Sequence, residues 1–191
     1  MAENDKRQRL FIALEIPKEI RNFIWEDVSS ILRKSNIKVS WVKPDNMHIT
    51  LKFLGDTPNS KIQEIISVLN EIFDSAPKIE TKLGKAGTFG GRNPRVVWIT
   101  PDGGIEMMKG LAGQINNRLA SLGFKKDKRR FSTHLTLGRV RQRRNTEPLK
   151  IEIEKLDYPP LRFSISSAVL IRSTLTQHGA IYEPIKIWEF N

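Results

Sequence analysis

The pattern His-x-Thr-Leu occurs twice in this chain, at residues 48–51 and 134–137, and this repetition limits the fold more than any other feature. The second copy follows the first by 86 residues, and the same offset relates the helix-like segment 18–34 to residues 104–120. Organisation that repeats at a fixed offset is typical of a duplicated unit. We therefore expect a single domain over residues 1–191, built from two lobes related by a pseudo-twofold axis.

Hydrophobic periodicity predicts both strands and helices in each half. Short or alternating apolar runs predict strands, and apolar residues at every third or fourth position predict helices. The expected strands are 9–16, 37–43, 47–54, 78–86, 96–99, 131–140, 161–172 and 181–190. The expected helices are 18–34, one that starts at Thr57-Pro58, and 105–122, while 146–156 fits either type. The fold class is thus predicted as α+β: two antiparallel sheets, flanked by helices, around a central cleft.

Strand geometry explains the spacing within the motif. Side chains alternate between the two faces of a strand, so His48 and Thr50 point one way, and so do His134 and Thr136. In a symmetric pair of lobes the four side chains would face one another. Such a site suits in-line transfer at phosphorus, because one neutral histidine can take a proton while one protonated histidine gives one. The threonine hydroxyls can donate to the non-bridging oxygens.

Composition indicates which classes of binding partner and which cellular compartment to expect. Lys plus Arg is 32 and Asp plus Glu is 21, so the net charge is +11, which favours polyanionic partners such as nucleic acid. The chain has no cysteine, which excludes disulfides, thiolate metal sites and a cysteine nucleophile. It shows neither a signal peptide nor an apolar run of membrane-spanning length, so we expect a cytoplasmic protein without a membrane partner.

These features together resemble a known family, the 2H phosphoesterases, and within it the RNA 2′,3′-cyclic phosphodiesterases, historically called 2′-5′ RNA ligases. The resemblance spans nearly the whole chain and is carried by Arg9–Leu14, Trp41, the segment 47–55, Pro94–Trp98, the segment 131–140, and Ser173, Leu175, Gly179 and Tyr182. The chain departs from the family pattern at Ser132-Thr133, where many members have a proline, and at Gly138, where alanine is more usual.

The resemblance implies a bilobal α+β fold with both motifs in a central cleft and no metal or other cofactor. It implies that the protein opens the 2′,3′-cyclic phosphate at the end of an RNA, tRNA fragments included, to give a 2′-phosphate. By motif order, His48 would correspond to the proton donor and His134 to the proton acceptor. We expect a monomer.

Three basic residues are candidates for binding phosphate. Lys52 shares strand parity with His48, and Arg130 shares it with His134. Arg139 has the wrong parity unless Gly138 marks a bulge, although the family pattern favours an arginine there. The alternative for each is an exposed surface cation, because most charged side chains are simply solvated.

Several rival interpretations remain at the level of sequence. The same residues would serve RNA ligation, in which an RNA 5′-hydroxyl replaces water. A nucleotide- or RNA-binding module without turnover is a second alternative, and a zinc site a third, although two histidines make an incomplete ligand set. His178 has no motif partner and is predicted to be a loop residue without catalytic function. Trp41 and Phe11 are predicted to belong to the core rather than to stack on a base.

Overall fold

The computed structural model describes residues 6–142, 144–177 and 179–191, so the prediction for His178 lies outside the described residues. Within them the strands are β1 (Arg7–Glu15), β2 (Val39–Trp41), β3 (His48–Pro58), β4 (Ile79–Phe89), β5 (Val96–Pro101), β6 (Leu135–Val140), β7 (Arg162–Ile165), β8 (Ser167–Thr176) and β9 (Gly179–Glu189). The helices are α1 (Lys18–Phe23), α2 (Ser29–Arg33), α3 (Ile62–Phe73), α4 (Ile105–Ser121) and α5 (Glu147–Glu154). A π-helical turn over Ile24–Val28 joins α1 to α2, and short 3₁₀ turns cover Pro44–Asn46 and Asn59–Lys61.

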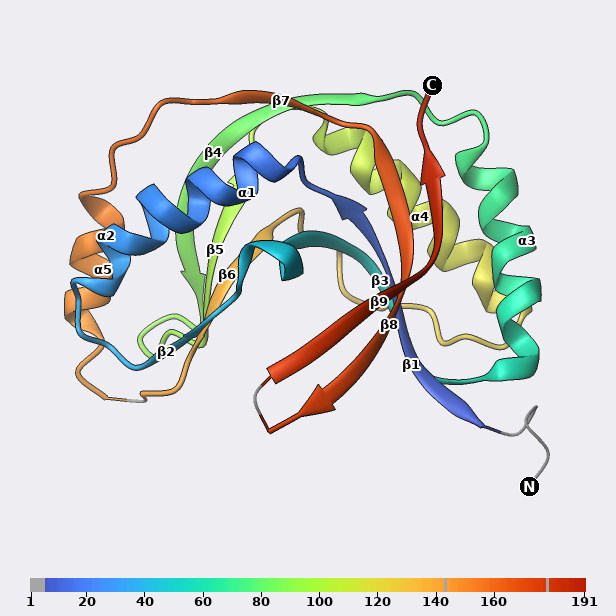
Figure 1. Cartoon of the computed structure of the whole chain (residues 1–191), viewed down its shortest axis with the longest axis horizontal. Helices are drawn as coiled ribbons and strands as arrows, with labels where there is room; N and C mark the ends of the chain where they lie inside the picture. The colour runs from blue at the N-terminus through green and yellow to red at the C-terminus, as the bar shows by residue number, and fades with distance from the viewer. Residues whose placement is uncertain (1–5, 143, 178) are drawn as a thin grey trace.

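All strand pairs are antiparallel and belong to one curved sheet in the order β7-β4-β5-β6-β3-β1-β8-β9, with β2 paired to β6 (Figure 1). The β8–β9 hairpin crosses the middle of the molecule and projects from it (Figure 1). The joint between β3 and β6 is narrow, because a single residue pair, Ile49 with Leu135, connects them. The two predicted sheets are therefore the two halves of one sheet that meet at this joint, and the α+β bilobal fold is confirmed.

The order of the strands follows the duplication. The half-sheet β4-β5-β6 corresponds to β8-β1-β3 at the 86-residue offset, and α4 corresponds to α1 and α2. Each half-sheet includes a strand from the other half of the sequence. The strand β4 lies in the half-sheet that contains the second motif, and β8 lies in the half-sheet that contains the first motif. The ambiguous segment 146–156 contains the helix α5 and so echoes α3.

The five α-helices pack on the same face of this sheet. Their buried side chains, from Ile20 of α1 to Leu149 of α5, join one hydrophobic core with Leu10, Ile12 and Leu14 of β1. The opposite face of β1 and β8 carries a small separate apolar cluster, comprising Phe11, Ala13, Val169 and Ile171, with Tyr182 packed against it. One face thus stabilises the fold, and the other, which we call the site face, carries none of these five helices.

Two segments differ from the sequence-based expectation. Residues 131–134 are irregular, so the second motif begins one residue before its strand, whereas β3 starts at His48. The chain at Thr57 and Pro58 still belongs to β3, and α3 begins only at Ile62 after a 3₁₀ turn. Of the helices in the described part of the chain, none combines the length and the apolar character that crossing a bilayer requires.

Candidate active site at the joint of the two lobes

The narrow joint places the two motifs beside each other. Ile49 pairs with Leu135, and in an antiparallel register the next residues on either side bring His48 opposite Thr136 and Thr50 opposite His134. Ile49 and Leu135 are buried in the core, so the neighbouring side chains point to the site face. The four motif side chains therefore meet on one face around the pseudo-twofold axis.

Both imidazole rings are held in the same way. His48 donates through Nδ1 to the Asn46 carbonyl oxygen at 2.8 Å, and His134 donates through Nδ1 to the Ser132 carbonyl oxygen at 2.8 Å. A carbonyl only accepts, so each Nδ1 carries a proton and each Nε2 is left for chemistry. The two carbonyls are themselves related by the 86-residue offset, so the duplication preserved the orientation of the rings as well as their identity.

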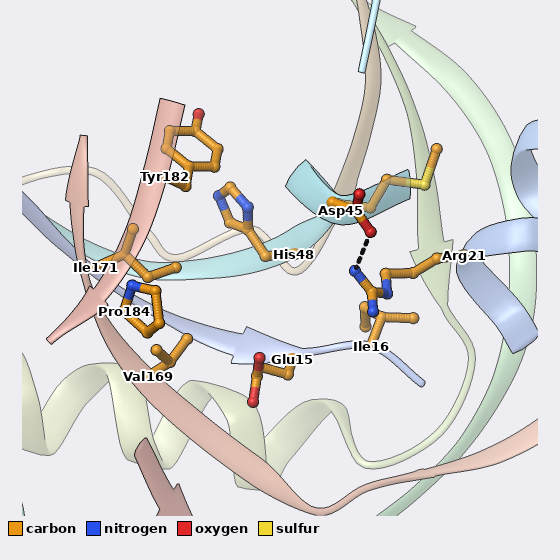
Figure 2. Close-up of a pocket in the computed structure, with 10 residues that line it drawn as sticks. Glu15, Ile16, Arg21, Asp45, His48, Val169, Ile171, Tyr182 and Pro184 are labelled. Atoms are coloured by element: carbon orange, nitrogen blue, oxygen red, sulfur yellow. Dashed lines mark ion pairs between the residues drawn. The ribbon is translucent and has the colours of Figure 1, made fainter. Parts of the chain in front are cut away.

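The surroundings of the two histidines differ. His48 packs against Phe11 and Tyr182, with ring centroids 4.8 and 5.5 Å away, and it borders a first pocket of about 100 Å³ with Ile171, Pro184 and others (Figure 2). The pKa of His48 is lowered to about 4, chiefly by burial and also by the nearby charges of His134 and Arg139, against the opposing hydrogen bond to Asn46. His48 is therefore neutral at pH 7 before substrate binds, and its Nε2 accepts from the Thr50 hydroxyl at 3.1 Å.

A β-bulge in each motif strand decides which basic residue reaches the site face. Between β5 and β6, Trp98 pairs with Thr136 but Val97 pairs with Gly138, so Leu137 is an extra residue. The bulge shifts the parity of the strand, and Arg139, paired with Val96, returns to the face of Thr136. Its charge also acts on His48 and Tyr182, which places it close to both. Arg139 thus reaches the site because a bulge lies beside Gly138.

The corresponding bulge in β3 removes Lys52 from the site. Ala13 pairs with Thr50 and Ile12 pairs with Lys52, so Leu51 is the extra residue and Lys52 turns to the core face. There it is only 2% exposed. Its ammonium group donates to Asn116 Oδ1 at 2.8 Å, to the Lys125 carbonyl at 3.0 Å and to Asp127 Oδ2 at 3.0 Å. The parity argument for Lys52 as a phosphate ligand is wrong, because it assumed a regular strand.

Arg130 lines a different pocket from the one that His48 lines. The parity argument fails here too, because residues 130–134 are not a strand. Arg130 is exposed and lines a second pocket of about 700 Å³, together with Trp98, Phe131, Ser132, Thr133 and residues of β4, β5 and α4. The ring of His134 touches Phe89 edge to face at 4.9 Å, and Phe89 lies 5.3 Å from Trp98. His48 itself lines the first pocket, whereas His134 is linked to the second pocket only through Phe89 and Trp98.

Sequence reasoning missed three contributors to the site face. Phe11 is buried, as predicted, but it packs against His48 instead of the main core. Tyr182 comes from β9, far along the chain, and burial raises its pKa while the charges of Arg139 and Arg9 lower it. Arg9 alternates with Phe11 along β1 and so lies on the same face. The alternation of β1 could have indicated Arg9 from the sequence. No local signal could have indicated Tyr182, because the sequence does not show where β9 packs.

Gly138 also has a local explanation. A Cβ atom at this position would lie 2.5 Å from Cγ1 of Val39 and 3.1 Å from the ring of Trp41, both on β2. The glycine therefore lets the short strand β2 approach the bulge in β6. Trp41 is partly buried against the main core, as predicted. Among the described residues, no group of three His, Cys, Asp or Glu side chains is placed to hold a metal ion.

Comparison with known proteins agrees with this geometry. The profile of the 2′-5′ RNA ligase superfamily matches residues 18–177. An RNA 2′,3′-cyclic phosphodiesterase of Methanocaldococcus jannaschii is 37% identical over 185 residues, which cover 94% of this chain and 99% of that one. A protein of the same name from Thermotoga maritima is 31% identical and covers 95% of both chains.

Solved structures show the same fold. The crystal structure of E. coli LigT in its apo form superposes with a TM-score of 0.74 at 26% identity, covering 98% of this chain and 99% of that one. The structure of LigT complexed with 3′-AMP superposes with a TM-score of 0.72 at 27% identity and covers 97% and 99% of the two chains. The profile match, the identity to the relatives and the shared fold agree: this chain belongs to the 2′-5′ RNA ligase superfamily.

Proposed function

We propose that this protein hydrolyses the 2′,3′-cyclic phosphate at the end of an RNA to a 2′-phosphate, with His48 and His134 as the acid and base. The observation that carries the proposal is the symmetric pair of imidazoles, each held at Nδ1 by a backbone carbonyl, so that Nε2 can exchange a proton. A threonine stands opposite each ring across the β3–β6 joint. In-line displacement needs a proton acceptor on one side of phosphorus and a donor on the other, and a twofold pair supplies both.

The reaction balances with groups of this chain and water alone. The oxygen of water attacks phosphorus and gives its proton to Nε2 of His134. The bond between phosphorus and the ribose 3′-oxygen breaks, and that oxygen takes the proton on Nε2 of His48. The Thr50 and Thr136 hydroxyls donate to the non-bridging oxygens, and the guanidinium of Arg139 on the site face balances the growing negative charge. The products are a 2′-phosphate and a free 3′-hydroxyl.

The pKa of His48 constrains this assignment of roles. With a pKa of about 4 before substrate binds, His48 holds no second proton at pH 7. A bound phosphodiester anion beside Nε2 would favour the charged imidazolium and raise that pKa. The donor role for His48 therefore requires that substrate binding brings a proton with it. Calorimetry of a nucleoside 2′-phosphate in buffers of different ionisation enthalpy measures this uptake. Binding without proton uptake would contradict the donor role and favour the reverse assignment.

The names of the relatives support the substrate. Two proteins that match over more than nine-tenths of this chain carry the name RNA 2′,3′-cyclic phosphodiesterase. LigT, of the same fold, has been solved with 3′-AMP, a nucleotide bearing a ribose phosphate. The net charge of +11 suits an RNA partner. A monomeric, cytoplasmic enzyme that needs no metal, with tRNA fragments among its substrates, remains part of the proposal.

The test is to incubate the protein with an RNA fragment ending in 2′,3′-cyclic phosphate, in excess chelator, and to identify the product by its phosphorus NMR shift. His48→Ala and His134→Ala should each lose about a hundred- to ten-thousand-fold in kcat, the usual contribution of an acid–base group. Thr50→Val and Thr136→Val should lose less. His178→Asn is the matched control and should keep wild-type turnover. Activity within a few fold of wild type in either alanine variant would remove that histidine from the mechanism.

A further inference from the structure

The 3₁₀ turn Pro44–Asn46 holds the ring of His48, because the Asn46 carbonyl accepts a hydrogen bond from its Nδ1 at 2.8 Å. Arg21 of α1 fixes this turn from one side. Its Nη1 donates to the Pro44 carbonyl at 3.0 Å and lies 3.8 Å from the Asp45 carboxylate (Figure 2). Any shift of the turn would move the carbonyl that orients His48, so whatever else holds the turn also bears on the ring.

The side chain of Asn46 connects this turn to a strand from the far end of the chain. Its amide nitrogen Nδ2 donates to the Ala180 carbonyl oxygen at 3.2 Å. In the described part of the chain, β9 is the last strand of the sheet, so the carbonyls on its outer side have no neighbouring strand as a partner. The Asn46 amide supplies a donor to one of them. Asn46 therefore holds His48 with its backbone and β9 with its side chain.

The strand that Asn46 holds is the one that covers His48. Ala180 is the second residue of β9, at the projecting end of the β8–β9 hairpin (Figure 1), and Tyr182 follows two residues later. The Tyr182 ring lies edge-on to His48, with centroids 5.5 Å apart, and 5.1 Å from Phe11. Phe11 in turn lies 4.8 Å from His48, so the three rings contact one another. The hydrogen bond at Ala180 thus fixes the strand that brings Tyr182 onto His48.

The second motif differs from the first at the corresponding position. Ser132 stands 86 residues after Asn46, and its carbonyl holds His134 as the Asn46 carbonyl holds His48. The Ser132 side chain is exposed and shorter than that of asparagine. The two copies therefore share the backbone contact to the ring but not the side-chain amide, and the copy with the amide is the one that Tyr182 covers.

The groups around His48 determine what would follow if the strand moved away. Six titratable or charged side chains line the first pocket or act on His48 through their charge. They lie on β1, α1, the 3₁₀ turn, β9 and β6, and are Glu15, Arg21, Asp45, Tyr182, His134 and Arg139. Burial is nevertheless the largest cause of the lowered pKa of His48. Water admitted beside the ring would stabilise the imidazolium and raise this pKa.

We infer that Asn46 is a positioning residue for His48: its side-chain amide keeps β9 against the 3₁₀ turn, so that Tyr182 stays on the ring and Nε2 keeps its direction. Asn46 acts through His48 and Tyr182 and not on the substrate itself. Its importance for turnover rests on the proposed function, whereas its effect on the ring belongs to the protein without substrate.

The test is an NMR titration of His48 in Asn46→Ala, which removes the amide but keeps the backbone carbonyl. The pKa of His48 should rise from about 4 towards 6.5 as the ring becomes solvated. On an RNA ending in 2′,3′-cyclic phosphate, kcat should fall about ten- to a hundredfold, because a displaced acid–base group loses its geometry for attack. Asn191→Ala is the matched control and should change neither quantity. It removes the same kind of bond, from Asn191 Nδ2 to the Asp74 carbonyl at 3.1 Å.

A second variant separates the amide from the mere size of the side chain. Asn46→Gln keeps a donating amide, and its His48 should titrate closer to wild type than that of Asn46→Ala. A His48 that titrates in Asn46→Ala as it does in wild type overturns the inference, and so does an equal shift in both variants. The titration needs no turnover. Failure of the wild type to open any cyclic phosphate would therefore overturn the proposed function and leave the positioning of His48 to be decided by NMR.

Discussion

At the scale of single residues, the two motif histidines share a sequence and a backbone hydrogen bond but not an environment. His48 is enclosed by Phe11 and Tyr182, whereas His134 makes its aromatic contact with Phe89 alone among the described residues. The two duplicated histidines therefore lie in different environments. Different environments allow one residue type to perform two roles in catalysis. The motif could be found from the sequence, but this asymmetry depends on Tyr182 of β9, which contacts His48.

The lowered pKa of His48 predicts how stability depends on pH. Between pH 4 and 6.5 the unfolded chain binds a proton at this residue while the folded protein does not. This contribution to stability is therefore complete above pH 6.5 and is lost as the pH falls towards 4, by up to about 3 kcal/mol. Urea unfolding at pH 7 and pH 4.5 measures it. His48→Gln should lose less stability between these two pH values than wild type, and equal losses would contradict the enclosed, neutral imidazole.

At the scale of elements, the two bulges decide the candidate site. Strand alternation predicts that His48 and Thr50 share a face, and no bulge lies inside the first three residues of that motif. Alternation fails at Lys52 because Leu51 is bulged. A β-bulge has no clear sequence signal within a run of apolar residues. The only sequence signal for either bulge was the glycine at position 138. Periodicity likewise could not choose between helix and strand for 146–156, where the apolar residues fit both.

The buried position of Lys52 predicts that it acts on stability instead of on phosphate. All three of its ammonium protons have acceptors, and through Lys125 and Asp127 it fixes the loop that follows α4. Lys52→Met should destabilise the protein by about 2 kcal/mol, the typical effect of losing hydrogen bonds to a charged group. Thermal unfolding and steady-state kinetics together provide the check. A raised KM without loss of stability would restore Lys52 as a phosphate ligand.

Close packing of β2 against β6 gives a second prediction at this scale. Gly138→Ala should cost about 1–3 kcal/mol, the usual effect of overpacking, because the new methyl group meets Val39. The double variant Gly138→Ala with Val39→Ala makes room for that methyl group and should recover part of the loss. A double-mutant cycle from urea unfolding measures the coupling between the two positions. Strict additivity would show that Val39 is not what makes the glycine necessary.

At the scale of the whole molecule, part of the positive charge lies on the segments that precede and follow the second motif. The loop between α4 and β6 carries Lys126, Lys128 and Arg129, all exposed, and Arg139 follows on the site face. Charge and clustering are visible in the sequence. The fold adds that this loop leads to Ser132, whose carbonyl holds His134.

This arrangement predicts that salt weakens RNA binding more for long substrates than for short ones. Each phosphate contact on a single strand contributes about −0.7 to the slope of log K against log salt concentration. A mononucleotide cyclic phosphate reaches Arg139 and the motif side chains, whereas an oligonucleotide can also reach the loop and so should show a steeper slope. Replacing Lys126, Lys128 and Arg129 together with serine should reduce the oligonucleotide slope towards that of the mononucleotide, without changing kcat. A slope that the triple variant leaves unaltered would mean that these cations only solvate the surface and that the RNA leaves the site by another path.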